Sequence, residues 1–166
     1  MNQAELNKII KNHQHWLKED CEGWEDMRAN LREANLTGAD LTGADLRGAI
    51  NIPFIPTVCP EKGSFIGFKK ARKLGKLSAI VELLIPEDAK RSSGTGKKCR
   101  CDKAKVLSIT SLDGKEQYGV AYSDYNHKFK YEVGKEVSVS DFCEDRFNEC
   151  AAGIHFFINR EEAVRY

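Results

Sequence analysis

The sequence predicts an α+β fold, and three patterns along the chain carry that prediction. Apolar residues recur with helical spacing near the N-terminus, a five-residue repeat follows, and short β-rich segments fill the remainder before a final helix. At 166 residues the chain is long enough to bury a core. We expect four parts: a helix and cap over 1–27, a repeat segment over 28–52, a linker over 53–62, and an α+β domain over 63–166.

The first predicted element is an amphipathic helix over residues 3–19. One face of this helix is apolar apart from a single histidine, and the other positions are mostly polar. Such a stripe needs a partner to cover it, and the repeat segment is the next element along the chain. The residues on this face are Leu6, Ile9, Ile10, His13 and Leu17.

The stretch RANLREANLTGADLTGADLRGAINI, residues 28–52, places leucines five residues apart at Leu31, Leu36, Leu41 and Leu46. Each leucine follows Asn or Asp, with Ala one position earlier, and this pattern resembles the pentapeptide-repeat family. The resemblance implies about one coil of a right-handed, square β-helix with its leucines pointing inward. A single coil cannot bury both of its ends. We expect the helix to cover one end and the following domain or a second subunit the other, which predicts a homo-oligomer.

Three prolines in NIPFIPTVCP end the repeats and predict the linker. Beyond it, alternating β-rich segments predict a mainly antiparallel sheet, with Asp113-Gly114 as a turn. Asn159 and Glu162 have the spacing of a capping box, which predicts the start of a C-terminal helix that covers one face of the sheet. The strands are expected at residues 77–85, 103–110, 117–123 and 154–158 and on both sides of Gly134.

Charge and hydropathy exclude several classes of protein. Lys and Arg number 26 against 25 Asp and Glu, and this balance argues against an extended nucleic acid as the partner. No apolar run approaches the ~20 residues of a membrane span, and no signal peptide opens the chain, so we expect a cytoplasmic protein. The six cysteines contain no C-x-x-C pair, and Cys99 and Cys101 have the spacing of packed strand residues. We therefore predict no metal site and no cofactor.

The stretch RSSGTGKKCRC, residues 91–101, is the densest candidate for an anion site. It combines two serines, two glycines and four cationic side chains, although a P-loop would need Gly at Arg91 and Ser or Thr at Lys98. The segment is therefore either a flexible loop that presents amides and cations to a phosphate or a solvated basic turn. The expected ligand-binding residues are Lys69, Lys90, Arg91, Ser92, Ser93, Lys97, Lys98, Arg100 and His155.

Four further motifs, GSFIGFKKA, IPEDAKRSSGTGKKCRCDKAKVLSI, YEVGKEV and ECAAGIHFFINREEAVRY, resemble an uncharacterised domain of bacteriophage and prophage proteins. The resemblance implies an accessory factor that acts in an infected or lysogenic bacterial cell. Cys150 and His155 come closest to a catalytic pair, but no constellation is complete. We expect a non-enzymatic protein that binds and sequesters a small phosphate-bearing ligand, with a nucleotide signal of host antiviral immunity as the most concrete candidate. The alternative is an interaction module that inhibits a host protein through the repeat coil and N-terminal helix.

Overall fold

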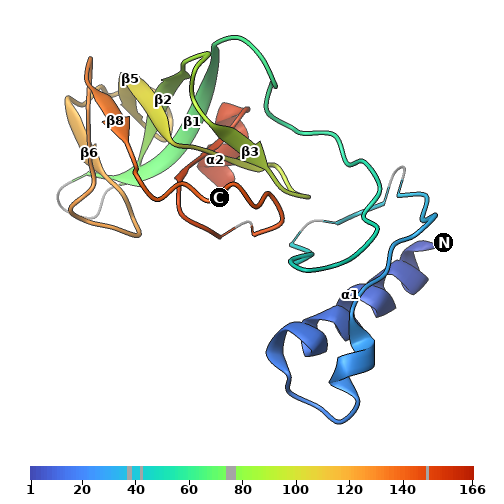
Figure 1. Ribbon diagram of the computed structural model, residues 1–166. Coiled ribbons are helices and arrows are strands. Elements are labelled where there is room, and N and C mark those ends of the chain that lie inside the picture. The colour runs from blue at the N-terminus through green and yellow to red at the C-terminus, as the bar shows by residue number, and fades with distance from the viewer. Residues whose placement is uncertain (37–38, 42, 74–77, 149) are drawn as a thin grey trace.

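A computed structural model describes residues 1–36, 39–41, 43–73, 78–148 and 150–166. The helix α1 (Gln3–Lys18) and the short helix η1 (Trp24–Met27) lie with the repeat segment, and an extended stretch leads from them to a sheet covered by α2 (Arg160–Arg165) (Figure 1). The predicted α+β class, with an N-terminal helix, an antiparallel sheet domain and a C-terminal helix, is confirmed at this level. Leu77 and Glu149, which belong to predicted segments, lie outside the described residues.

The start and end of α1 are fixed by local chemistry. The Asn2 side chain accepts a hydrogen bond from the Glu5 backbone N–H at 2.9 Å, and the Glu5 carboxylate accepts one from the Asn2 N–H at 2.8 Å. This reciprocal capping box satisfies backbone donors that the first turn leaves free. The helix ends at Lys18 because Glu19 adopts the left-handed conformation, with φ of 53°.

The repeat segment buries three of its leucines in one cluster with Leu6 of α1, and Leu36 packs against that cluster while partly exposed. The buried leucines are Leu31, Leu41 and Leu46. Each unit contains a tight turn in which the Ala N–H donates to the preceding Leu carbonyl, for example Ala34 to Leu31 at 3.1 Å. An isolated parallel bridge joins Asn30 to Ile50. The same turn recurs between Ala39 and Leu36, Ala44 and Leu41, and Ala49 and Leu46.

Two side chains of α1 cap backbone groups of the repeats. The Gln3 amide donates to the Asp40 carbonyl at 3.1 Å and accepts from the Asp40 N–H at 3.0 Å, so it bonds as a neighbouring peptide group would. His13 Nδ1 lies 3.2 Å from the Ala29 N–H, and Nε2 lies 3.0 Å from the Arg47 carbonyl. These partners require Nδ1 to accept and Nε2 to carry the proton. The polar groups at this edge are therefore satisfied by the helix.

The same leucine cluster is also covered from the side of the sheet domain. Ile52, Ile55 and Phe147 pack against it. Both covers come from within the chain, so the physical reason for expecting a second subunit falls away. Self-association stays a prediction.

Among the described residues, nine strands form one sheet in the order β3-β4-β9-β1-β2-β5-β8, with β6 and β7 attached through β1. Every registered strand pair is antiparallel. The strands are β1 (Phe65–Arg72), β2 (Ser78–Ile85), β3 (Arg91–Ser93), β4 (Lys98–Cys101), β5 (Lys103–Ser111), β6 (Val120–Tyr122), β7 (Lys130–Glu132), β8 (Glu136–Ser138) and β9 (Ile154–Phe157).

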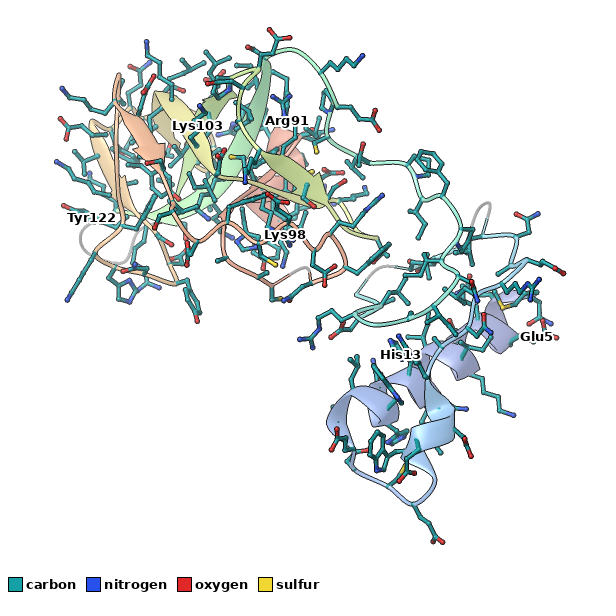
Figure 2. All side chains as sticks on the ribbon, in the orientation of Figure 1. Glu5, His13, Arg91, Lys98, Lys103 and Tyr122 are labelled. Carbon is teal, nitrogen blue, oxygen red and sulfur yellow. The ribbon has the colours of Figure 1, made fainter. Side chains whose placement is uncertain are left out.

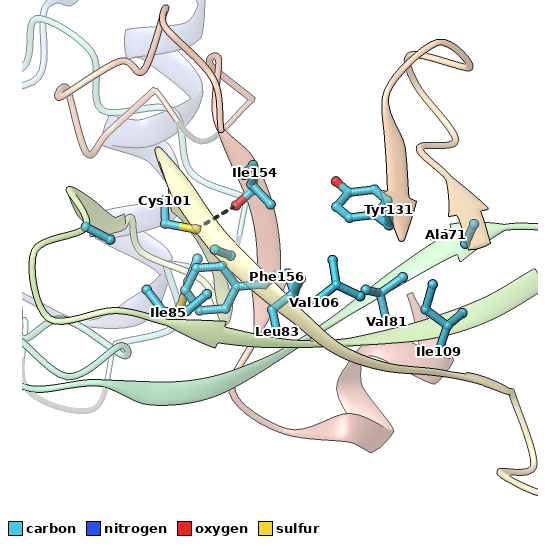
Figure 3. Packing of buried hydrophobic residues seen from close by; sticks show 14 of the residues in the cluster. Ala71, Val81, Leu83, Ile85, Cys101, Val106, Ile109, Tyr131, Ile154 and Phe156 are labelled. Atoms are coloured by element: carbon cyan, nitrogen blue, oxygen red, sulfur yellow. Dashed lines mark hydrogen bonds between the residues drawn. The ribbon is translucent and has the colours of Figure 1, made fainter. Parts of the chain in front are cut away.

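The sheet has a core on each face. Figure 3 shows the larger one, in which Val81, Leu83 and Phe156 are fully buried. On the other face, Ile80 and Phe157 pack under Ala163 of α2. Alternate strand residues point to opposite faces, which explains how β2 and β9 serve both cores.

The capping box predicted for α2 is not formed. Asn159 holds the N-cap position, but its side chain makes no capping hydrogen bond within the described part of the chain. Glu162 instead pairs with Lys97 at 2.8 Å. The Arg160 guanidinium ties the helix start to the sheet by donating to the carbonyls of Ser111, at 2.9 Å, and Leu112, at 3.0 Å.

Candidate functional site

The predicted anion segment is a hairpin of β3 and β4, and its geometry divides the candidate residues between two faces. Ser92 pairs with Arg100, which in turn pairs with His155 on β9, so these three share a face. Arg91 and Ser93 alternate with Ser92 and point to the opposite face. The residues on the first face are Ser92, Lys98, Arg100 and His155, and those on the second are Lys69, Arg91 and Ser93.

Arg91 is occupied by backbone carbonyls. Its guanidinium donates to the carbonyls of Gly63, Pro86 and Glu87, each at 2.7 Å, with longer bonds to two further carbonyls. The planar group offers five donors and can satisfy several acceptors at once. Arg91 therefore holds the entry to β1 against the turn after β2 and has little donor capacity left for a phosphate.

Arg100 plays a similar part on the other face. Its side chain is buried, and it donates to the carbonyls of Cys143, at 3.1 Å, Asp145 and Asn148. These bonds hold the loop over residues 141–150 against β4. Because Phe147 of that loop packs on the leucine cluster, Arg100 also supports the contact between the sheet domain and the repeats.

Arg146 is an organising residue that the sequence analysis did not single out. It donates to the carbonyls of Ile55, at 2.7 Å, Ser93, at 3.1 Å, and Gly94, at 3.3 Å. The Ser93 hydroxyl also accepts a bond from the Val58 N–H at 2.8 Å. The segment predicted as a linker is thus packed along β3 in its Ile55–Val58 part.

A buried thiol pair strengthens the same contact. Cys59 lies in the larger core, and its thiol is hydrogen-bonded to Cys99 of β4. This bond lowers the pKa of Cys59, and the same contact raises the pKa of Cys99. Both thiols are buried, so we interpret them as packing groups rather than as an exposed nucleophile.

The candidate lysines differ from the arginines because their partners are at the surface. Lys90 pairs with Glu144 at 2.6 Å, and Lys97 with Glu162 at 2.8 Å. Exposed ion pairs of this kind contribute roughly 0–1 kcal/mol and exchange partners readily. The Lys98 ammonium lies 3.7 Å from the Cys150 thiol and 5.7 Å from the centre of the Tyr166 ring. These lysines could still meet an anion.

Lys69 lies on β1 among the residues of the larger core face. Burial lowers the pKa of its ammonium, and the nearby Asp124 carboxylate opposes that effect. Ser92 is also buried, and its hydroxyl has no hydrogen-bond partner among the described residues. Burial therefore distinguishes Ser92 from the exposed Lys90 and Lys97, and Lys69 lies on the opposite face of the sheet from Lys98.

A groove of about 410 Å³ lies on the sheet domain, away from the β3–β4 hairpin. Figure 2 shows Tyr122, one of its lining residues, at the side of the domain away from Arg91 and Lys98. The Lys73 ammonium sits 4.1 Å from the centre of the Tyr118 ring. Ligand cavities commonly measure roughly 300–1,000 Å³, so this groove has the size for a small metabolite. It is lined by Lys73, Gln117, Tyr118, Gly119, Val120 and Tyr122.

The walls of this groove are fixed by backbone pairing. The Tyr118 N–H donates to the Ile109 carbonyl at 2.8 Å, and the Val133 N–H donates to the Gly119 carbonyl at 3.1 Å. The strand β6 joins β1 where Tyr122 pairs with Arg72. In the sequence, the two tyrosines of the groove stand four residues apart, at 118 and 122, within a segment predicted to be a strand. This spacing alone does not distinguish a ligand groove from an ordinary strand.

Comparison with known proteins places the chain in a family without an assigned activity. A family of unknown function (DUF5758) matches residues 55–163, and pentapeptide repeats match residues 27–50. The chain is 32% identical over 116 residues to an uncharacterized protein of Acanthamoeba polyphaga mimivirus, a match that covers 64% of this chain and 73% of that protein. The chain therefore belongs to the DUF5758 family and carries pentapeptide repeats ahead of the family domain.

No solved structure matches the chain. In the described ranges, none of the helices combines the length and the apolar character that crossing a bilayer requires.

Proposed function

We propose that the protein binds a small ligand that carries both negative charge and a flat unsaturated ring, and that it holds this ligand without changing it chemically. The observation that carries the proposal is the cavity in which the Lys73 ammonium lies over the Tyr118 ring at 4.1 Å. A mononucleotide or cyclic nucleotide has both of the required chemical features.

The two features have separate physical partners in the groove. Stacking of a base on an aromatic side chain contributes about 1–3 kcal/mol, and it tolerates any base because every base has a π face. The Lys73 ammonium supplies a positive charge over the Tyr118 ring, and its flexible side chain can turn aside to let a base stack. The Gln117 amide can donate to and accept from a ring edge. Arg72, bonded to Asp124 at 2.9 Å, adds a second cation near the Tyr122 end.

The biological setting is part of the proposal. The ligand would be a nucleotide signal of host immunity, which a viral accessory protein sequesters in the cytoplasm of an infected cell. The phage-type sequence motifs and the similarity to a mimivirus protein support a viral setting. Within this proposal the basic hairpin of β3 and β4 is the rival location for the ligand.

The test is calorimetric titration of the full chain with a panel of linear and cyclic nucleotides. Tyr118→Ala should weaken binding roughly 5- to 150-fold, the equivalent of losing one stacking contact. Lys73→Ala should also weaken binding, and the binding that remains should depend less on salt because one cation has been removed. Lys97→Ala with Lys98→Ala is the matched control, because it removes two cations from the rival location. Bound nucleotide is then released by denaturation and identified by mass spectrometry.

The outcomes separate the possibilities. Loss of binding in the Lys97 and Lys98 variant, with Tyr118→Ala unaffected, would move the site to the β3–β4 hairpin. Recovery of a hydrolysed nucleotide would refute sequestration and indicate an enzyme. Failure of every nucleotide to bind would refute the ligand proposal itself.

We also infer that the repeat segment forms about one coil of a right-handed pentapeptide β-helix. The parallel bridge from Asn30 to Ile50 supports this, because the two residues are separated by four units of five residues. The recurring Ala-to-Leu turns and the inward leucines fit the same geometry. The inference implies that the coil contributes a rigid support and not a long rod.

A second candidate function rests on exposed apolar residues between the repeats and the sheet. Phe54 is 80% exposed, Val58 45% and Ile50 36%. A phenylalanine so exposed favours a contact with a partner protein that offers an apolar pocket. This is the protein-interaction alternative, with the contact moved from the repeat face to the segment that follows it.

The second candidate is tested with Phe54→Ser and, as the control, Val133→Ser, which alters an apolar residue that is 41% exposed on a different part of the chain. A host-protein complex should be lost in the first variant and kept in the second. If light scattering shows instead that Phe54→Ser converts a dimer to a monomer, Phe54 belongs to a contact between two copies. Retention of the complex by both variants would refute the proposed contact.

A further inference from the structure

The end of α1 brings together three metal-ligating side chains outside the groove and the basic hairpin. Each residue offers one ligand atom, and these atoms lie within 4.8 Å of one another. His15 Nδ1 is 2.6 Å from the nearer Asp20 oxygen. The residues are His15, Asp20 and Cys21.

The chain reversal after α1 creates this arrangement. Glu19 is left-handed, and its N–H donates to the His15 carbonyl at 2.8 Å, so the chain turns back towards the helix. Asp20 and Cys21 therefore return beside His15 and do not continue along the axis. A second left-handed residue, Gly23 with φ of 73°, leads into η1, which places the Met27 sulfur 3.8 Å from the Cys21 sulfur.

We propose that His15, Asp20 and Cys21 bind one Zn²⁺ ion, with water in the fourth position. Imidazole nitrogen, carboxylate oxygen and thiolate sulfur are the three ligand types of protein zinc sites, and three protein ligands with one open position is a common zinc geometry. The carboxylate also distinguishes this set from the all-sulfur and sulfur–imidazole sets that closed structural sites favour.

The ligand atoms need only short movements to reach the ion. Bond lengths of about 2.0–2.3 Å in a tetrahedron separate ligand atoms by roughly 3.3–3.6 Å. The His15–Asp20 contact would open from 2.6 Å by roughly 0.7–1.0 Å, and the Cys21 sulfur would approach the other two ligand atoms by at most roughly 1.5 Å. The His15 and Asp20 side chains are 35% and 40% exposed, so they can rotate, and an ion can reach them from solvent.

This site was not predicted from the sequence, and it involves neither Cys99 nor Cys101. Cys99 and Cys101 are buried in the core of the sheet, whereas His15, Asp20 and Cys21 lie in one short stretch at the other end of the molecule. An ion here would fasten the turn that leads to η1 against α1, the helix that covers the repeats. Binding should therefore raise the melting temperature of the N-terminal part, which holds both tryptophans, Trp16 and Trp24.

The experiment uses chelator-treated full-length protein titrated with Co²⁺ as a spectroscopic substitute for Zn²⁺. One equivalent should produce a thiolate-to-cobalt charge-transfer band and the visible bands of a tetrahedral site, and Zn²⁺ should displace both. Cys21→Ser should abolish the charge-transfer band. His15→Ala and Asp20→Asn should weaken Zn²⁺ affinity by more than the roughly 10–100-fold that loss of an outer-shell partner costs.

Two controls keep the test specific. Glu22→Gln removes a neighbouring exposed carboxylate and should leave Co²⁺ binding unchanged. Met27→Leu should also leave it unchanged, because a thioether is a soft ligand that favours Cu⁺. Loss of the band in Met27→Leu, together with tighter binding of Cu⁺ than Zn²⁺, would overturn the zinc assignment in favour of a soft-metal site.

A second measurement needs no variant. Zn²⁺ should slow alkylation of Cys21 by iodoacetamide, followed by mass spectrometry, while the exposed Cys150 reacts at an unchanged rate. Equal Cys21 rates with and without Zn²⁺ would refute the proposal. So would a cobalt charge-transfer band that persists in Cys21→Ser.

Discussion

Replacing Arg100 by alanine is expected to destabilise the sheet domain. Arg100 is 3% exposed, and its guanidinium donates to three carbonyls of the loop over residues 141–150. A hydrogen bond from a charged donor contributes about 1.5–3 kcal/mol. The loop is partly exposed, so water would recover some of this after the substitution. We therefore expect the free energy of unfolding to fall by about 2–4 kcal/mol.

The assay is urea unfolding followed by near-ultraviolet circular dichroism at tyrosine wavelengths, because all five tyrosines lie in the sheet domain. Tryptophan fluorescence is a separate probe of the N-terminal part. Arg100→Lys should fall between wild type and Arg100→Ala, because lysine keeps the charge but loses the planar fork. Lys97→Ala is the control; its side chain is 72% exposed, and its effect should stay within about 0.5 kcal/mol.

One result would refute this reasoning directly. If Arg100→Ala unfolds with the wild-type urea midpoint and slope but no longer binds a nucleotide that the wild type binds, Arg100 contacts the ligand. The hydrogen bonds from Arg100 to the loop carbonyls would then contribute little to stability, and the β3–β4 hairpin would be the binding site.

Two further predictions concern packing and pH. Gly67→Ala should lower the free energy of unfolding by about 1–3 kcal/mol, because its new Cβ would lie 2.5 Å from a ring carbon of Phe156. Gly119→Ala is the control, since its Cβ would meet no heavy atom within 4 Å. Equal urea midpoints for the two variants would contradict the prediction. Burial lowers the pKa of His13 below 6.5, so the unfolded chain binds a proton at a higher pH than the folded chain does. The stability of the N-terminal part, followed by tryptophan fluorescence, should therefore fall as the pH drops below 6.5. His13→Gln should remove this slope, and a slope that persists in it would assign the effect to another group.

The sequence predicted the structure well where the pattern lies within a single helix or strand. The helical stripe of α1 and the β-rich alternation of β2 and β5 are local patterns, and the structure contains those elements close to the predicted bounds. The capping box of α2 failed because Glu162 had a competing partner, Lys97, from another part of the chain. A local rule could not anticipate that competition.

The candidate site was harder to predict because it depends on which groups meet in space. A cluster of cations beside glycines resembles an anion site, but Arg91 and Arg100 are taken up by carbonyls that only the folded chain brings to them. The groove draws Lys73 from the end of β1 and Tyr118 from the approach to β6, and nothing in the intervening sequence signals that they meet. Pairing between distant strands determines the groove.

The amide of Gln3 occupies backbone groups at one edge of the repeat segment. By bonding to both backbone groups of Asp40, it occupies a position where the peptide of another chain could pair. A variant without α1 would leave the backbone groups of Asp40 without these partners, and we expect it to associate with other copies more readily than the full chain does. We infer that the helix limits association between copies of the chain at this edge of the repeats.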